Sequence, residues 1–201
     1  MLGLLNRELP SSVEVDGETV ELCCGFRTGI KAFEFLNDKD ESTMFNLLYL
    51  FYGLERDDGL LELPEVVAAH AKEAAEESVE WLLGAFQVMD YDNASMHKRR
   101  SNSKQNFSFT ADEAIIYADF RRFYGIDLMN SETQMHWYQF IALLLSAMRT
   151  EGSLTGTAIA AREPIPGNAK GHERERLRKL QKAWALPMTE NELLQRALEM
   201  F

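Results

Sequence analysis

Two histidines lie beside carboxylates at spacings that could support metal binding or proton transfer. His70 precedes Glu73 and Glu77, which fall near one face of the helix expected there. A metal site would need further ligands from another segment, and the sequence marks none. His136 follows Glu132 by one helical turn, and we interpret it as a partly buried, hydrogen-bonded histidine. We therefore expect no metal and no catalytic residue at either histidine.

Nucleophilic and cofactor chemistry have no recognisable motif in this chain. Cys23 and Cys24 are adjacent, so a bridge between them would close almost no loop, and we expect them to pack as small apolar residues in a reducing cytosol. The chain has no G-x-S-x-G elbow and no glycine-rich nucleotide-binding unit. The prediction is a protein that is not an enzyme and binds no cofactor.

Two basic clusters could contact phosphate groups. One comprises His97, Lys98, Arg99, Arg100 and Lys104, and the other Arg174, Arg176, Arg178, Lys179 and Lys182. Aromatic residues for base stacking do not alternate with them, and residues 1–95 hold 6 lysine and arginine against 20 aspartate and glutamate residues. Nucleic acid is therefore not an expected partner, although a nucleic-acid-binding regulator using residues 97–104 stays as a third alternative.

No segment predicts membrane association or secretion. The longest apolar run, Phe140–Leu145, is far shorter than the roughly 20 residues that span a bilayer. The N-terminus lacks the positive region and the apolar length of a signal peptide. We expect the protein to stay in the cell that makes it.

The elements around these residues are predicted to be mainly helical. Alternating Val13, Val15, Val20 and Leu22 around Asp16-Gly17 predict a β-hairpin within residues 11–24. Apolar periodicity predicts helices whose ranges are 26–37, 43–54 with Ser42 as N-cap, Pro64 to about Met89, 110–124, 131–150, 154–162 and 172–184. Capping boxes, Thr110 with Glu113 and Ser131 with Gln134, mark two of the starts.

These elements predict a mainly α, compact helical domain over residues 1–187, with the N-terminal hairpin packed on it. Residues 90–108 are polar and lack periodicity, so we expect a mobile surface loop. Residues 188–201 form a predicted C-terminal helix that could act as an interaction appendage. The predicted core comprises Ile116, Phe120, Phe123, Trp137, Phe140, Ile141, Leu144 and Met148.

Several segments resemble a family of small siphophage tail-region proteins, encoded between the tail-tube and tape-measure genes. The most specific are DEAIIYADF (112–120), YGIDL (124–128), HW (136–137), FIALL (140–144) and TGTAIAAREPIP (155–166). The match extends more weakly to FRTGIKAFEF (26–35) and LRKLQKAWALP (177–187). The quoted positions are aromatic and aliphatic residues at helical spacing, and the resemblance supplies no functional residue.

The resemblance implies a non-enzymatic tail assembly chaperone that binds the tape-measure protein and tail-tube subunits in the host bacterial cytoplasm and is absent from the mature virion. Exposed partner contacts are predicted at Leu194, Leu198 and Phe201 of the last helix and at Arg99 and Arg100. Self-association into a homo-oligomer stays open. The alternative is a minor structural component of the tail or a general protein-interaction module, since the acidic front half could contact basic tail proteins.

Overall fold

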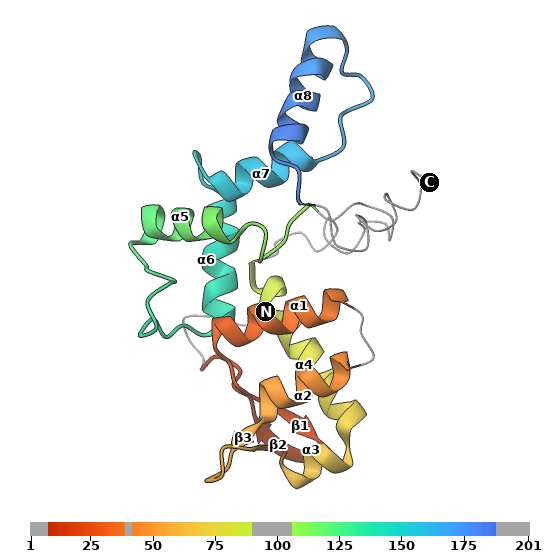
Figure 1. Ribbon diagram of the computed structural model, residues 1–201, viewed down its shortest axis with the longest axis vertical. Coiled ribbons are helices and arrows are strands. Elements are labelled where there is room, and N and C mark those ends of the chain that lie inside the picture. The colour runs from red at the N-terminus through yellow and green to blue at the C-terminus, as the bar shows by residue number, and fades with distance from the viewer. Residues whose placement is uncertain (1–7, 39–41, 90–105, 188–201) are drawn as a thin grey trace. The chain divides into compact units, whose positions relative to one another are not determined.

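The computed structural model describes residues 8–38, 42–89 and 106–187 of the 201-residue chain. Its fold is mainly helical with a small N-terminal antiparallel hairpin, which confirms the predicted fold class (Figure 1). The contacts divide the chain into two compact units: unit 1 comprises Met1–Arg99 and Met129–Ser146, and unit 2 comprises Arg100–Leu128 and Ala147–Phe201. The single domain over residues 1–187 stays a prediction.

The predicted N-terminal hairpin of unit 1 is present. Strand β1 (Ser12–Val15) pairs antiparallel with β2 (Glu18–Glu21), and the pairing of Val15 with Glu18 leaves Asp16-Gly17 as a two-residue turn. Both turn residues have positive φ, 49° and 79°, as this type of tight hairpin turn requires. The hairpin packs its β1 strand against helix α4 (Ala71–Gly84), and Val15 is buried.

The helices of unit 1 differ in length from those predicted. Helices α1 (Phe26–Asp38) and α2 (Thr43–Tyr52) lie where periodicity places them, with Ser42 as N-cap and Gly53 as C-cap of α2, although the Ser42 side chain makes no capping hydrogen bond. The single helix predicted from Pro64 to Met89 is wrong. The chain forms α3 (Glu65–Ala69), then α4, then a 3₁₀ helix (Ala85–Met89).

The first of these interruptions lies at His70. Its φ of −118° and ψ of 42° lie outside the helical region. Its ring lies 3.3 Å from a carboxylate oxygen of Asp16 in the β1–β2 turn, whose backbone N–H donates to Glu73. These contacts join the β1–β2 turn to the junction between α3 and α4.

A second small hairpin in unit 1 was not predicted. Strand β3 (Leu54–Glu55) pairs antiparallel with β4 (Leu61–Glu62), and Gly59 lies in the turn between them with a φ of 76°. The dipeptide Asp58-Gly59 is the same kind of turn signal as Asp16-Gly17. This dipeptide is the sequence signal that could have predicted the second hairpin.

Helix α6 (Trp137–Arg149) contributes the centre of unit 1 and begins six residues later than predicted. The capping box of Ser131 and Gln134 is wrong, because the backbone before α6 is bonded elsewhere. Phe26 N–H donates to Met135 O and Trp137 N–H donates to Cys24 O, at 2.9 and 2.8 Å. These bonds pair the segment before α6 with the segment before α1, so it cannot be helical there.

Aromatic side chains fill the core of unit 1. The Trp137 ring stacks on Phe140 at 5.7 Å between centroids, and Phe140 stacks on Phe26 at 5.3 Å. Trp137 Nε1 donates to Leu82 O at 2.9 Å. All four predicted core residues of this unit are buried: Trp137, Phe140, Ile141 and Leu144.

Unit 2 contains helices α5 (Glu113–Tyr124), α7 (Leu154–Arg162) and α8 (Gly171–Ala183). Helix α5 ends at residue 124, as predicted, and Gly125, with a φ of 68°, is its C-cap. The Thr110–Glu113 capping box is wrong, because Asp112 occupies the N-cap position of α5. Of the predicted core residues here, Ile116 and Phe120 are buried, whereas Phe123 and Met148 are only partly buried.

Candidate functional site

The histidines and cysteines that could carry chemistry have structural surroundings. His70 lies near Asp16 and Glu73, at 3.3 and 3.9 Å, but within residues 8–38, 42–89 and 106–187 no group of three or more His, Cys, Asp or Glu side chains is arranged to hold a metal ion. Cys23 is exposed, which corrects the expectation that both cysteines pack inside. Burial raises the pKa of Cys24 to about 11, assisted by Cys23 and Glu21, so its thiol stays protonated at neutral pH.

His136 anchors the N-terminal segment of the described chain. It does not share a helix with Glu132, because α6 begins after it. Its Nδ1 accepts from the backbone N–H of Tyr138 at 3.1 Å, and its Nε2 lies 3.2 Å from Pro10 O. Burial lowers the pKa of His136, and the bond to Pro10 opposes that shift only in part. The imidazole is therefore neutral at pH 7, with its proton on Nε2, and shares the Pro10 carbonyl with Trp81 Nε1 at 2.7 Å.

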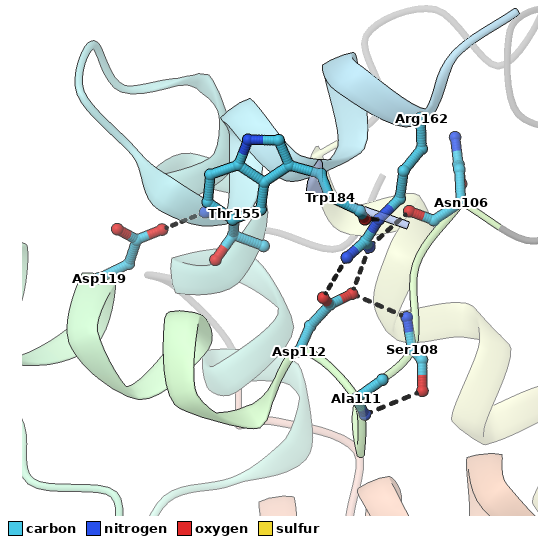
Figure 2. A network of polar contacts seen from close by, with 8 residues as sticks. All are labelled: Asn106, Ser108, Ala111, Asp112, Asp119, Thr155, Arg162 and Trp184. Atoms are coloured by element: carbon cyan, nitrogen blue, oxygen red, sulfur yellow. Dashed lines mark hydrogen bonds and ion pairs between the residues drawn. The ribbon is translucent and has the colours of Figure 1, made fainter. Parts of the chain in front are cut away.

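A buried ion pair organises unit 2, as Figure 2 shows. Both terminal nitrogens of Arg162 donate to the carboxylate of Asp112, each at 2.7 Å, and the two side chains are 10% and 2% exposed. The same guanidinium donates to the backbone carbonyls of Asn106 and Trp184, at 3.1 and 2.5 Å. Asp112 also accepts from the backbone N–H of Ser108. One arginine thereby joins the end of α7 to the start of α5 and to the segments at residues 106 and 184.

Asp119 of α5 caps the start of α7 from across unit 2. Its carboxylate accepts from Ser153 Oγ at 2.7 Å and from the backbone N–H groups of Leu154 and Thr155 at 3.0 and 2.9 Å. The bond from Thr155 is drawn in Figure 2. Burial by itself would raise the pKa of Asp119, but these hydrogen bonds outweigh it and hold the pKa below its ordinary value. The carboxylate is therefore ionised, and its role is to fix α7 rather than to transfer protons.

Replacing Asp119 by asparagine should destabilise unit 2 by roughly 2 kcal/mol at pH 7. The amide oxygen cannot accept all three hydrogen bonds, and the amide NH2 group would face N–H or O–H donors. Since the pKa of Asp119 is lower in the folded than in the unfolded protein, its contribution is complete above about pH 4 and is lost as the pH falls further. The difference between wild type and Asp119→Asn should therefore shrink in acid. Urea unfolding at pH 7, 5 and 3, followed by hydrogen exchange of residues 113–124 and 154–162, would measure it.

The control is Asp127→Asn, which removes a carboxylate of the same unit that pairs with Arg121 at 3.7 Å on the surface. That change should cost less than about 1 kcal/mol. A pH-independent loss at Asp119, or equal losses at the two positions, would contradict the capping role.

The exposed apolar side chains are concentrated in one segment of unit 1. Of the nine large hydrophobic side chains exposed in the described part of the chain, six lie between residues 44 and 61. They belong to α2 and the β3–β4 hairpin, and we call them the α2–hairpin surface: Met44, Phe45, Tyr49, Leu54, Leu60 and Leu61. Several large apolar side chains left exposed within one short segment are typical of a protein-binding region.

The partner contacts predicted from sequence cannot be placed. The residues Leu194, Leu198, Phe201, Arg99 and Arg100 lie outside the described residues, as do most of the predicted loop (90–108) and all of the predicted C-terminal helix (188–201). The second basic cluster lies on α8, where all five basic side chains are exposed and Lys179 pairs with Glu175 at 2.9 Å. No helix among the described residues has the length and apolar character needed to cross a membrane.

One known protein family matches most of the chain. The family model described as Bacteriophage Gp15 protein matches residues 5–186. The chain belongs to the bacteriophage Gp15 protein family. No curated protein and no solved structure matches this Gp15 family member. The α2–hairpin surface and the Arg162 ion pair both lie within the region matched to Gp15, and the resemblance to phage proteins is confirmed at the level of this family.

Proposed function

We propose that this Gp15 family protein is a non-enzymatic tail assembly chaperone that binds the tape-measure protein, and tail-tube subunits, during tail morphogenesis. The observation that carries the proposal is the α2–hairpin surface, where six large apolar side chains are exposed within 18 residues of chain. The resemblance to proteins encoded between the tail-tube and tape-measure genes suggests the tape-measure protein as the protein that it binds. A long helical client with unpaired apolar faces needs an apolar surface on its chaperone until assembly covers those faces.

The first test is co-expression with the tape-measure protein of the same phage. We expect the tape-measure protein to be more soluble in the presence of this chain and the two proteins to elute as one complex. Expression of the tape-measure protein with a chain carrying Leu60→Ser and Leu61→Ser should give less soluble complex. Unchanged tape-measure solubility, with no co-elution at low salt, would refute the chaperone function.

A minor structural component of the tail is the second candidate, because residues 1–95 are strongly acidic and could contact basic tail proteins. The two functions differ in the finished particle. Mass spectrometry of purified virions should detect no stoichiometric amount of a chaperone that is released on assembly. Recovery of this chain in a fixed ratio to tail-tube protein would favour the structural role.

A further inference from the structure

The β3–β4 hairpin exposes a leucine on each of its two faces. In an antiparallel pair, directly opposed residues lie on the same face, and successive residues of a strand alternate between faces. Leu54 opposes Glu62 and Leu61 opposes Glu55, so Leu54 and Leu61 project to opposite sides. Leu54 is 62% exposed and Leu61 is 52% exposed, and Leu60 in the turn is 64% exposed. Within the described residues of unit 1, both faces of this hairpin therefore keep an exposed leucine.

Helix α2 continues the apolar surface. Its inner face buries Leu47, Leu48, Phe51 and Tyr52 in unit 1. Phe45 and Tyr49 are four residues apart, so they lie together on the outer face, and both are exposed. Gly53 alone separates the end of α2 from the start of β3, so the helix is followed directly by the hairpin (Figure 1).

The charges around these side chains are almost all negative. The hairpin carries four acidic residues, Glu55, Asp57, Asp58 and Glu62, and one basic residue, Arg56. Arg56 lies within ion-pair distance of Asp58 and Glu62, at 3.8 and 3.5 Å. Helix α2 has no acidic or basic side chain. A partner that buries the leucines therefore meets an acidic rim, which favours lysine or arginine beside its own apolar residues.

We propose that the α2–hairpin surface binds amphipathic helical segments of one partner, one against each face of the hairpin, whose apolar stripes are flanked by lysine and arginine residues. The identity of the client as the tape-measure protein rests on the proposed function, whereas the required chemistry follows from the surface itself. Strand addition is disfavoured, because strands of two residues offer too few unpaired backbone groups to hold an extended peptide. A symmetric pairing of two copies through this surface would place two acidic rims against each other.

The binding test uses the full chain and two synthetic helical peptides with the same leucine stripe, one with lysine flanks and one with glutamate flanks. Fluorescence anisotropy at low salt should show the lysine peptide binding at least about tenfold more tightly, with an affinity that falls as salt is added. The Leu60→Ser, Leu61→Ser chain should bind the lysine peptide at least about tenfold more weakly, because burial of a leucine is worth roughly one to two orders of magnitude in an equilibrium constant.

Two control chains separate this surface from general effects. Met129→Ser removes a side chain of unit 1 that is 66% exposed and lies outside the α2–hairpin surface, and it should leave peptide affinity within about twofold of wild type. Glu55→Lys with Asp57→Lys should abolish the preference for lysine flanks. Glu80→Lys with Glu151→Lys makes the same change in net charge elsewhere and should retain that preference.

Equal binding of the two peptides, or equal losses in the Met129 and leucine variants, would overturn the proposal. Sedimentation that shows wild-type self-association abolished by the leucine substitutions would also overturn it, in favour of a second copy as the occupant. The test is independent of the chaperone test. Peptide binding at this surface without tape-measure co-elution would refute the proposed function alone, whereas co-elution that survives the leucine substitutions would refute this surface alone.

Discussion

Replacement of Arg162 by methionine is expected to lower the free energy of unfolding of unit 2 by about 3–5 kcal/mol. Methionine keeps most of the aliphatic length but removes every donor of the guanidinium. Asp112, whose side chain is 2% exposed, would be left as a buried carboxylate without its cation. The carbonyls of Asn106 and Trp184 would lose a donor as well. An uncompensated buried charge costs far more than the net gain of forming the pair.

Urea unfolding monitored by hydrogen exchange of residues 113–124 and 154–162 would measure this loss within unit 2. Arg176→Met on α8 is the matched control, since it removes an exposed arginine and should change stability by less than about 0.5 kcal/mol. The double variant Asp112→Leu, Arg162→Met should recover part of the loss, because it removes both charges together. A single variant as mild as Arg176→Met, or a double variant that loses the sum of the two single changes, would contradict the role of the pair.

Substitution of Gly29 by alanine should destabilise unit 1 by about 3 kcal/mol, although the same change inside a helix is ordinarily favourable by about 1 kcal/mol. Gly29 lies in α1, and a methyl group there would overlap the indole ring of Trp137. That ring is fully buried and stacks on Phe140, and its Nε1 donates to Leu82 O. It cannot move aside without breaking these contacts.

Thermal or urea unfolding followed by circular dichroism at 222 nm would measure the effect, with near-ultraviolet bands reporting the tryptophan environment. Gly25→Ala is the control, since a methyl group there would meet only Thr28 Oγ1 at 3.8 Å. It should leave stability nearly unchanged. Stabilisation by Gly29→Ala would mean that α1 and Trp137 are not packed this closely.

The predictions that succeeded depend on residues that act on their own backbone. Asp16-Gly17 specifies a tight turn because both residues accept positive φ, and Gly125 ends α5 for the same reason. Those that failed depend on distant partners. Thr110 with Glu113 has the spacing of a capping box, but Asp112 takes the N-cap position, where Arg162, 50 residues away, holds its carboxylate. Ser131 with Gln134 has the same spacing, yet the backbone beyond it pairs with residues 24–26.

The α2–hairpin surface, too, was only partly predictable from the sequence. The leucines at 54, 60 and 61 and the acidic residues among them are visible in the sequence, but hydrophobic residues in a short segment are usually buried. Only the tertiary packing shows that α2 buries one face while Phe45 and Tyr49 stay outside. It alone shows that, in the described part of unit 1, a leucine is exposed on each side of the β3–β4 hairpin.

The sequence by itself determined the helical class, the N-terminal hairpin, the acidic front half and the phage resemblance, because periodicity, turn residues and charge are local properties. Tertiary structure decided where α5 and α6 begin, which carboxylates are buried and paired, and which apolar side chains stay exposed. These features depend on contacts between residues far apart in the chain, such as Asp112 with Arg162 or Gly29 with Trp137. No local pattern encodes which distant side chain will satisfy a buried charge or cover an apolar face.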